Sequence, residues 1–285
     1  MKVALDSQPA EPSRENEDFA AAVPGAAVLL DGAGVAGAET GCVHGIAWFS
    51  ATLGGLLLSA VSTQSTRPLV ECLADSIRAV RSLHGDTCDL AHRASPTSTV
   101  VAVRAGAGVL EYLVLGDSTL LLADLDGETT AVTDQRSDEV GKRLRAPVDL
   151  LPTGSAEHVV ALAEYREALT GLRNQPGGFW IAGPDPLAAE HAFTGTAPVE
   201  SLTSVTLLSD GATRLVDLFE LATWQDTLAA VGSVGSVGSV GSVGSVGPDG
   251  LIRRVREAEA GDPDGRRWPR GKAQDDATIL HWVLA

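Results

Sequence analysis

Aspartate residues recur beside the expected strands of this sequence, and this pattern carries most of its chemical information. The segments are Asn16-Glu17-Asp18, Asp31-Gly32, Gly116-Asp117-Ser118, Ser209-Asp210-Gly211 and Asp275-Asp276-Ala277-Thr278. A single Asp-Gly pair after a strand is usually only a turn, but a whole series at strand borders needs another explanation. Carboxylates gathered at one edge of a sheet repel one another unless cations lie between them. Because oxygen ligands suit Mg²⁺ or Mn²⁺ rather than zinc, we expect a site for such an ion.

A glycine-rich segment offers a competing interpretation. Residues 32–37 match the pattern G-x-G-x-x-G after a strand, which is typical of dinucleotide-binding proteins. Asp31 directly precedes the first glycine, however, where its charge would oppose a pyrophosphate. The acidic residue expected about 20 positions later is also missing, since no Asp or Glu occurs between Glu39 and Glu71. We therefore set the dinucleotide interpretation aside.

The charge balance is strongly acidic. The chain of 285 residues has 37 acidic and 21 basic side chains, for a net charge of −16. The phosphates of DNA, RNA and anionic membranes would repel such a protein, so we expect no nucleic-acid or membrane partner. Apolar residues make up 44% and charged residues 20% of the chain, which is ordinary for a globular protein. The length allows one large domain or two small ones.

The sequence shows no targeting or membrane-spanning segment. No apolar run reaches the roughly 18 residues that a transmembrane helix needs. The longest candidate, residues 45–61, contains Ser50, Thr52 and Ser59. Charged side chains are scattered through the first twenty residues, where a signal peptide would have its apolar region. We therefore expect a soluble, cytoplasmic protein.

Cysteine and histidine residues suggest no metal site by their spacing. The chain has 3 cysteines and no Cys-x-x-Cys pair, which argues against both a disulfide framework and a structural zinc. Cys42 and His44 would need two further ligands to bind zinc, and none is spaced suitably. Surface or core roles are expected for the other histidines, His84, His92, His158, His191 and His281.

Short apolar runs and turn signals predict groups of strands with helices between them. Strands are expected over residues 26–30, 98–104, 110–115, 119–123, 129–133, 178–182, 204–208 and 277–284. Helical patterns cover residues 39–60, 68–83, 157–169, 215–228 and 250–260. Because hairpin turns join consecutive strands, the pattern favours antiparallel sheets covered by helices over a regular alternation of strands and helices.

Two segments are expected to lie outside the core. Residues 1–12 are predicted to be a flexible N-terminus that precedes a single domain over residues 13–285. Residues 231–247 repeat the triplet Val-Gly-Ser, and Gly/Ser-rich repeats of this kind behave as flexible coil. We therefore expect a flexible loop without chemistry, inserted in the domain.

The order of the acidic motifs resembles that of the metal-dependent serine/threonine protein phosphatase 2C family, in its bacterial form with a single catalytic domain. The motifs N-E-D, D-G-x-G, G-D-S, S-D-G and D-D-A-T occur in this order between Asn16 and Leu284. Residues 97–103 are similar to the family's strand before the G-D-S hairpin, and residues 132–134 to its L-T-x-D segment. The resemblance implies an α+β fold in which two packed antiparallel sheets are flanked by helices on both sides.

The resemblance also implies a site for two Mn²⁺ or Mg²⁺ ions. Asp31 would bridge the two ions, and Gly32 would offer its carbonyl oxygen. Asp210 and Asp275 would complete the direct ligands. The three aspartates would thereby support catalysis, since two divalent ions lower the pKa of a bridging water and direct it at phosphorus.

Further residues receive supporting roles from the same resemblance. Asp117 would help to hold a third, weaker metal ion, and the acids Glu17 and Asp18 would hold waters bound to the metals. The family's phosphate-binding arginine lies just before the N-E-D motif, so Arg14 is the candidate for that role. Where family members often place a His or Met after D-G, this chain has an alanine. His44 is therefore the candidate for a substitute general acid.

The expected activity is the removal of phosphate from phosphoserine or phosphothreonine in proteins, by a water activated between two divalent metals. The partners would be a phosphorylated protein substrate and a serine/threonine kinase pathway, with the phosphatase itself a monomer. An alternative remains open, because the accessory residues around the metal motifs depart from the family pattern. In that alternative the chain is a catalytically weak regulatory or binding module that keeps the phosphatase fold and metal site.

Overall fold

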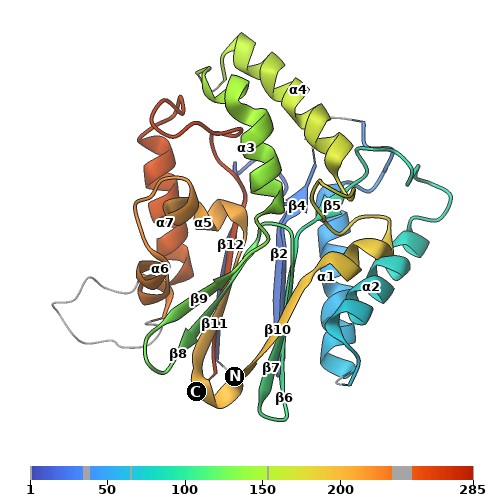
Figure 1. Ribbon diagram of the computed structural model, residues 1–285, viewed down its shortest axis with the longest axis vertical. Coiled ribbons are helices and arrows are strands. Elements are labelled where there is room, and N and C mark those ends of the chain that lie inside the picture. The colour runs from blue at the N-terminus through green and yellow to red at the C-terminus, as the bar shows by residue number, and fades with distance from the viewer. Residues whose placement is uncertain (1, 35–38, 65, 153, 233–245, 285) are drawn as a thin grey trace.

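Two antiparallel sheets lie face to face in the computed structural model, which describes residues 2–34, 39–64, 66–152, 154–232 and 246–284 (Figure 1). The strand order of the first sheet is β1 (Lys2–Gln8), β12 (Ala277–Val283), β11 (Leu202–Leu208), β8 (Thr119–Asp124) and β9 (Thr129–Val132). The order of the second is β10 (Phe193–Pro198), β7 (Val109–Leu115), β6 (Val100–Gly106), β3 (Ala26–Leu30) and β2 (Phe19–Val23). A short two-stranded ribbon pairs β4 (Gly32–Ala33) with β5 (Thr97–Ser98).

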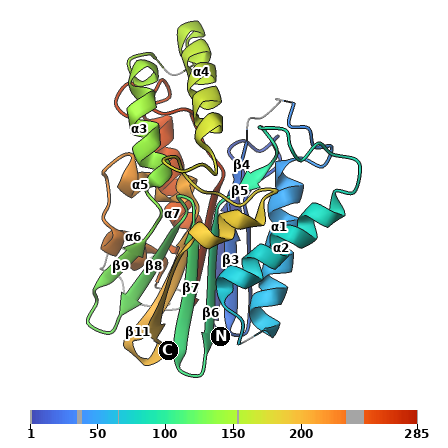
Figure 2. The same ribbon diagram turned by 45° about the vertical axis from the view of Figure 1, so that its right-hand side comes forward.

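Helices cover the outer faces of both sheets, as the sequence predicted (Figures 1 and 2). On the second sheet lie α1 (Ile46–Thr63) and α2 (Leu69–Leu83). On the first sheet lie α5 (Asp210–Asp217), α6 (Trp224–Val231) and α7 (Gly247–Ala260). At one end of the sandwich stand α3 (Arg136–Asp149) and α4 (Ala156–Leu172), and short 3₁₀ turns η1 (Pro186–His191) and η2 (Val199–Ser201) flank β10.

The strand β3 serves two layers of the core at once. Its side chains Ala27 and Leu29 lie in the layer between the two sheets. The alternate residues Ala26, Val28 and Leu30 pack with α1 and α2. Because successive side chains of a strand point to opposite faces, a short apolar run without polar interruptions predicts a strand that is buried on both sides.

The N-terminus is part of the fold, which corrects the prediction of a flexible segment over residues 1–12. The strand β1 pairs with β12 along its whole length, from Lys2 opposite Val283 to Gln8 opposite Ala277. Its sequence KVALDSQ is polar and only partly buried, so it has no strong apolar alternation of its own. It is an edge strand held by the hydrogen bonds of its neighbour, and the domain therefore includes residues before 13.

Several element predictions differ from the structure. The helix expected over residues 215–228 is two helices, α5 and α6, because Thr223 and Asp226 form a capping box that begins the second one. The helix α3 was not expected, since few of its residues are apolar. The segment 178–182 forms no strand but takes part in two isolated bridges, Phe179 with Arg173 and Ala182 with Ser98. The long helix expected from residue 39 begins only at Ile46.

The Val-Gly-Ser repeat expected over residues 231–247 falls mainly outside the described residues, which omit 233–245. Its two borders are described. Val231 is the last residue of α6, and Gly247 is the first residue of α7. The borders of the insertion are therefore ends of helices that pack on the first sheet.

The helix α1 is long and apolar enough to cross a membrane, judged by length and composition alone. In this fold it packs against α2 and the second sheet, with Phe49, Leu53 and Leu57 buried in the core. A core helix of a folded domain has the same apolar character, and the packing of α1 accounts for its composition.

Candidate metal centre

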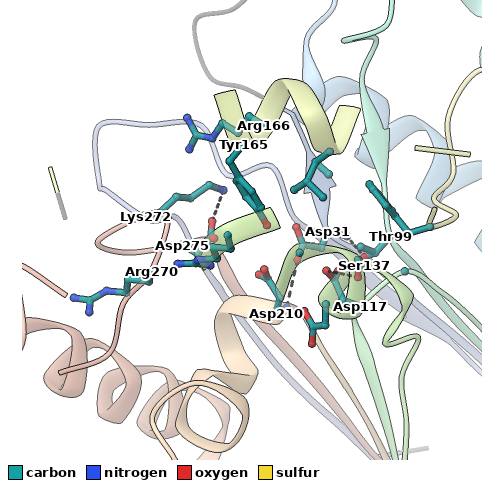
Figure 3. A pocket seen from close by; sticks show the side chains of 18 of the residues that line it. Asp31, Thr99, Asp117, Ser137, Tyr165, Arg166, Asp210, Arg270, Lys272 and Asp275 are labelled. Atoms are coloured by element: carbon teal, nitrogen blue, oxygen red, sulfur yellow. Dashed lines mark hydrogen bonds and ion pairs between the residues drawn. The ribbon is translucent and has the colours of Figure 1, made fainter. Parts of the chain in front are cut away.

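A cavity of about 560 Å³ lies at the end of the sandwich that α3 and α4 cover (Figures 1 and 3). Four of the predicted aspartates line it: Asp31, Asp117, Asp210 and Asp275. We call this space the carboxylate cavity. The predicted carbonyl ligand, Gly32, also lines it. The structure thus brings together at one place the residues that the sequence predicted as metal ligands.

Strand ends position these side chains. Asp31 follows the last residue of β3, and Asp117 lies in the turn between β7 and β8. Asp210 is the first residue of α5, directly after β11, while Asp275 lies just before β12. The four segments come from both sheets and meet at the same end of the sandwich, so side chains far apart in sequence share one cavity.

Two glycines beside these aspartates allow neighbouring segments to approach closely. A Cβ atom on Gly211 would lie 1.9 Å from the carbonyl oxygen of Asp276, and one on Gly32 would lie 2.6 Å from the carbonyl oxygen of Glu17. Any side chain at either position would push these segments apart. The glycines of the motifs S-D-G and D-G-x-G are therefore needed for close packing, and not only for turns.

The carboxylates in the cavity raise one another's pKa values. Burial raises the pKa of Asp31 well above its usual range and that of Asp117 to about 7. The negative charge of Asp210 is the second cause in both cases. Desolvation within the cavity and the charge of Asp275 raise the pKa of Asp210, although that residue still contacts solvent. The Asp31 carboxylate accepts a hydrogen bond from the backbone N–H of Asp210, which lies 3.3 Å from its Oδ2 atom. Bound cations would relieve this repulsion, and the all-oxygen donors fit Mg²⁺ or Mn²⁺.

The N-E-D segment lies against the same cluster. The two carboxylate oxygens of Asp18 are buried and have no hydrogen bond of normal geometry, although the hydroxyls of Ser209 and Thr278 are close. Burial raises the pKa of Asp18 to about 7 and also raises that of Glu17. Buried carboxylate oxygens without partners are suited to accept hydrogen bonds from water around a cation. Neither acid lines the cavity directly, which agrees with a role through water.

Asp276 connects the N-terminal part of the chain, including the N-E-D segment, to the start of β12. Its carboxylate accepts hydrogen bonds from the backbone N–H groups of Ala10 and Glu17, each at 2.7 Å. It is therefore an anchor for the N-terminal chain, and its charge is held by backbone donors. The neighbouring Asp275 side chain remains directed at the cavity, as Figure 3 shows.

Two cations contact the predicted ligand Asp275, and the sequence analysis had not singled out either of them. The Nζ atom of Lys272 lies 2.7 Å from Asp275 Oδ1 (Figure 3). An Nη atom of Arg214 lies 3.1 Å from Asp275 Oδ2. Burial alone would lower the pKa of Lys272, but the carboxylates of Asp275 and Asp210 raise it above its usual value. The sequence holds no clear signal for either contact, because the segment from Lys272 to Asp275 is not helical and Arg214 lies 61 residues before Asp275.

The helix α4 forms the far wall of the carboxylate cavity. Tyr165 projects from it towards the aspartates, and Arg166 lies beside Tyr165 on the same helix (Figure 3). Burial lowers the pKa of Arg166 and raises that of Tyr165. From α3, Ser137 donates a hydrogen bond to Asp117 Oδ2 at 3.1 Å. These side chains line the cavity on the side of α3 and α4.

The two accessory residues proposed from the resemblance lie elsewhere. Arg14 is exposed and borders a second, smaller cavity, which it shares with Lys272. His44 is not among the residues that line the carboxylate cavity. Its Nδ1 atom lies 3.8 Å from Cys42 Sγ and 3.3 Å from Cys88 Sγ, beside the first turn of α1. The structure therefore does not bring His44 into position to protonate a leaving group at the aspartates.

No protein-family model matches this sequence, and no curated protein matches it either. Solved structures with the same fold do match over the whole chain. A Caenorhabditis elegans sex determining protein superposes with a TM-score of 0.58 at 15% identity. The match covers 100% of this chain and 65% of that one. The Mycobacterium tuberculosis serine/threonine phosphatase PstP/Ppp gives a TM-score of 0.56 at 15% identity, covering 99% of this chain and 98% of the other.

A third match names the class directly. The PPM Ser-Thr phosphatase MsPP from Mycobacterium smegmatis gives a TM-score of 0.54 at 18% identity, over 100% of this chain and 99% of that one. At these identities the likeness shows the fold. The chain thus has the fold of the PPM-type serine/threonine phosphatases, which confirms the fold predicted from the acidic motifs.

Proposed function

We propose that this protein is a metal-dependent phosphomonoesterase that removes phosphate from phosphoserine or phosphothreonine in protein substrates. The observation that carries the proposal is the carboxylate cavity, where aspartates from four separate segments meet at one end of a phosphatase fold. Their mutual repulsion is only partly balanced, since Lys272 and Arg214 pair with Asp275 alone among these aspartates. Such a site is organised to hold additional positive charge.

Particular residues would hold the metal ions. Asp31, Asp210 and Asp275, with the carbonyl oxygen of Gly32, are the direct ligands of two Mn²⁺ or Mg²⁺ ions in this proposal, and Asp117 supports a third. When bound, such ions supply charge neutralisation at the phosphoryl oxygens and a water of lowered pKa. Asp18 and Glu17, which lie behind the ligands, would orient water by accepting its hydrogen bonds.

The leaving alkoxide needs a proton, and the cavity is poorly supplied with donors. No histidine occurs among its lining residues in the described part of the chain. Tyr165 carries a hydroxyl proton, but burial raises the pKa of that group further. General acid catalysis typically contributes 10²–10⁴-fold. We therefore expect an aryl phosphate, whose leaving group needs little protonation, to be hydrolysed much better than a phosphoserine peptide.

The decisive experiment measures hydrolysis of an aryl phosphate and of a phosphoserine peptide with Mn²⁺ and with EDTA. We expect Mn²⁺-dependent turnover that Asp210→Asn lowers at least about 100-fold, because a direct ligand is lost. The matched control is Asp75→Asn, which changes an exposed aspartate on α2 and should leave the rate within about twofold of wild type. Absence of Mn²⁺-dependent turnover on both substrates would refute the enzymatic proposal.

A second candidate function has one specific observation in its favour. The ammonium of Lys272 and the guanidinium of Arg214 both contact Asp275, so two internal cations compete with a metal ion for this carboxylate. Under this alternative the chain is a regulatory or binding module that retains the phosphatase fold but turns over poorly. Calorimetry would then detect Mn²⁺ or phosphopeptide binding by a protein that releases no phosphate.

A further inference from the structure

A second group of potential metal ligands lies away from the carboxylate cavity. It consists of Cys42, His44, His84 and Cys88, whose ligand atoms all lie within 4.8 Å of one another. We call it the cysteine–histidine cluster. None of its members lines the carboxylate cavity. The sequence analysis had argued against a structural zinc, because Cys42 and His44 lacked two suitably spaced partners, and the fold supplies these partners as His84 and Cys88.

The three distances among Cys42, His44 and Cys88 are close to those of a tetrahedral site. Zinc binds sulfur at about 2.3 Å and imidazole nitrogen at about 2.0–2.1 Å, so a tetrahedron places two sulfurs about 3.8 Å apart and a sulfur and a nitrogen about 3.6 Å apart. The two Sγ atoms of Cys42 and Cys88 are 3.6 Å apart. The Nδ1 atom of His44 lies 3.3 Å from Cys88 Sγ and 3.8 Å from Cys42 Sγ. Three of the four ligand atoms are thus already positioned around a common centre.

The fourth ligand, His84, has its free nitrogen ready for a metal. Its side chain is buried, with the residue only 3% exposed, and its Nδ1 atom is 2.9 Å from the carbonyl oxygen of Val80. A carbonyl only accepts, so Nδ1 must donate its proton, and Nε2 keeps a lone pair. That Nε2 atom is buried and has no hydrogen-bond partner among the described residues. A histidine oriented by a backbone carbonyl in this way is typical of metal ligands.

The surroundings hold the ligands in place. The helices α1 and α2 pack against each other, so that the start of α1 lies beside the end of α2 (Figures 1 and 2). The backbone N–H of Asp89 donates to the carbonyl of Gly41 at 2.8 Å, which joins the two ligand-bearing loops. Trp48 stacks on His44 with ring centroids 4.2 Å apart and meets His84 edge-on at 4.9 Å.

Cys88 also has a backbone donor. The N–H group of Val43 lies 3.4 Å from its Sγ atom, and such a hydrogen bond stabilises a thiolate over a thiol. Cys42, His44 and Cys88 are only partly buried, so an ion could reach the cluster from solvent. The remaining cysteine, Cys72, lies on α2, is fully buried in the hydrophobic core and does not belong to the cluster.

We propose that Cys42, His44, His84 and Cys88 bind one Zn²⁺ ion in a closed tetrahedral site, which joins the loop before α1 to the turn after α2. Four protein ligands leave no position for water or substrate, so the role of the ion is structural. Two thiolates and two imidazoles favour zinc over the Mg²⁺ or Mn²⁺ that suit the carboxylate cavity. The proposal does not depend on phosphatase activity.

The test measures zinc per chain by elemental mass spectrometry after gel filtration of protein expressed with added zinc. Wild type should retain about one zinc ion per chain, and Cys42→Ser should lose it. The matched control, Cys72→Ala, should retain it. An Asp31→Asn/Asp210→Asn variant should also retain it, which separates this site from zinc held by the carboxylates. Zinc lost from that variant but kept by Cys42→Ser would overturn the proposal.

Two measurements on the wild-type protein test the site without any variant, so they do not depend on whether a variant folds. Replacing the ion with Co²⁺ should give the intense visible bands of a tetrahedral site and a thiolate-to-cobalt charge-transfer band. Alkylation should spare Cys42 and Cys88 until a zinc-selective chelator is added. A zinc-free protein that takes up neither ion, or one in which mass spectrometry finds a Cys42–Cys88 disulfide in place of the metal, would refute the proposal.

Discussion

The carboxylate cavity and the cysteine–histidine cluster each take their first ligands from the same stretch of the chain, residues 31–44, but have opposite chemistry. Asp31 and Gly32 belong to the first, and Cys42 and His44, which follow shortly after, belong to the second. The cavity offers only oxygen donors around an open space of about 560 Å³. The cluster offers sulfur and nitrogen donors within 4.8 Å of one another, and in our proposal all four bind one ion. Open sites of this kind suit catalysis, and closed ones suit structure.

The two regions also differ in what the metal-free protein must tolerate. Desolvation in the cavity, and after it the repulsion between carboxylates, raises the pKa values of Asp31, Asp117 and Asp210. Thiols and neutral imidazoles carry no such charge, so the cluster can form before an ion arrives. Metal binding would therefore relieve repulsion between carboxylates at the first site, whereas at the second it would mainly hold two loops together.

The largest expected effect comes from removing one ligand at each site. Asp31→Asn should lower Mn²⁺-dependent aryl phosphate hydrolysis at least about 100-fold while zinc content stays unchanged. Cys88→Ser should abolish zinc binding and leave the hydrolysis rate within about threefold, since no cluster residue lines the cavity. Rates and elemental analysis of both variants check this separation. An equal loss of activity in the two variants would show that the regions act as one unit.

A smaller effect is expected from removing Lys272, one of the two cations that pair with Asp275 in the carboxylate cavity. Lys272→Met removes an ammonium that lies 2.7 Å from Asp275. Calorimetry should show Mn²⁺ affinity rising about tenfold, equivalent to about 1.4 kcal/mol, because the ion no longer competes with a lysine. Lys142→Met is the matched control, since Lys142 borders the same cavity without an ion pair to Asp275. Weaker Mn²⁺ binding by Lys272→Met would contradict the competition.

The last expected effect is the pH dependence of stability without bound Mn²⁺ or Mg²⁺. The folded-state pKa values of Asp18 and Asp117 are raised from 3.8 to about 7, chiefly by burial. The folded state therefore binds protons more tightly than the unfolded state, so stability falls as the pH rises from about 4 to about 7. Melting temperatures should decline over this range, and less so with Mn²⁺. Asp18→Asn should reduce the slope, and Cys42→Ser should leave it unchanged; a flat profile in wild type would contradict the argument.

Local patterns explain how much of the fold could be predicted. The run Ala26–Leu30 is apolar at every position, and Pro68 precedes an amphipathic helix that the structure places at Leu69–Leu83. Elements with weak patterns were missed. The strand β1 depends on pairing with β12, and α3 buries only Val140, Gly141 and Val148. Propensity is informative where an element carries its own apolar face, and fails where a neighbour supplies the stability.

The carboxylate cavity was predictable for the same reason. Each of the four predicted aspartates adjoins a strand end or a helix start with its own local signal, and strand ends of a sandwich gather at its edges. Lys272 and Arg214 were not predictable in this way, because nothing local says that their side chains turn towards Asp275. Tyr165 lines the cavity because α4 packs over that end of the sheets, and the sequence does not predict this placement of α4 (Figure 3).

By itself the sequence determined the acidic charge, the alternation that builds two sheets and the aspartates at the strand borders. These features depend on residues that are close together in the sequence. Successive side chains of a strand point to opposite faces, so position along the strand already decides the face that each one occupies. Only the tertiary structure decided that Cys42 and Cys88, 46 residues apart, bring their sulfurs to 3.6 Å. That distance depends on the lengths of α1 and α2 and on how they pack, and no spacing along the chain encodes it.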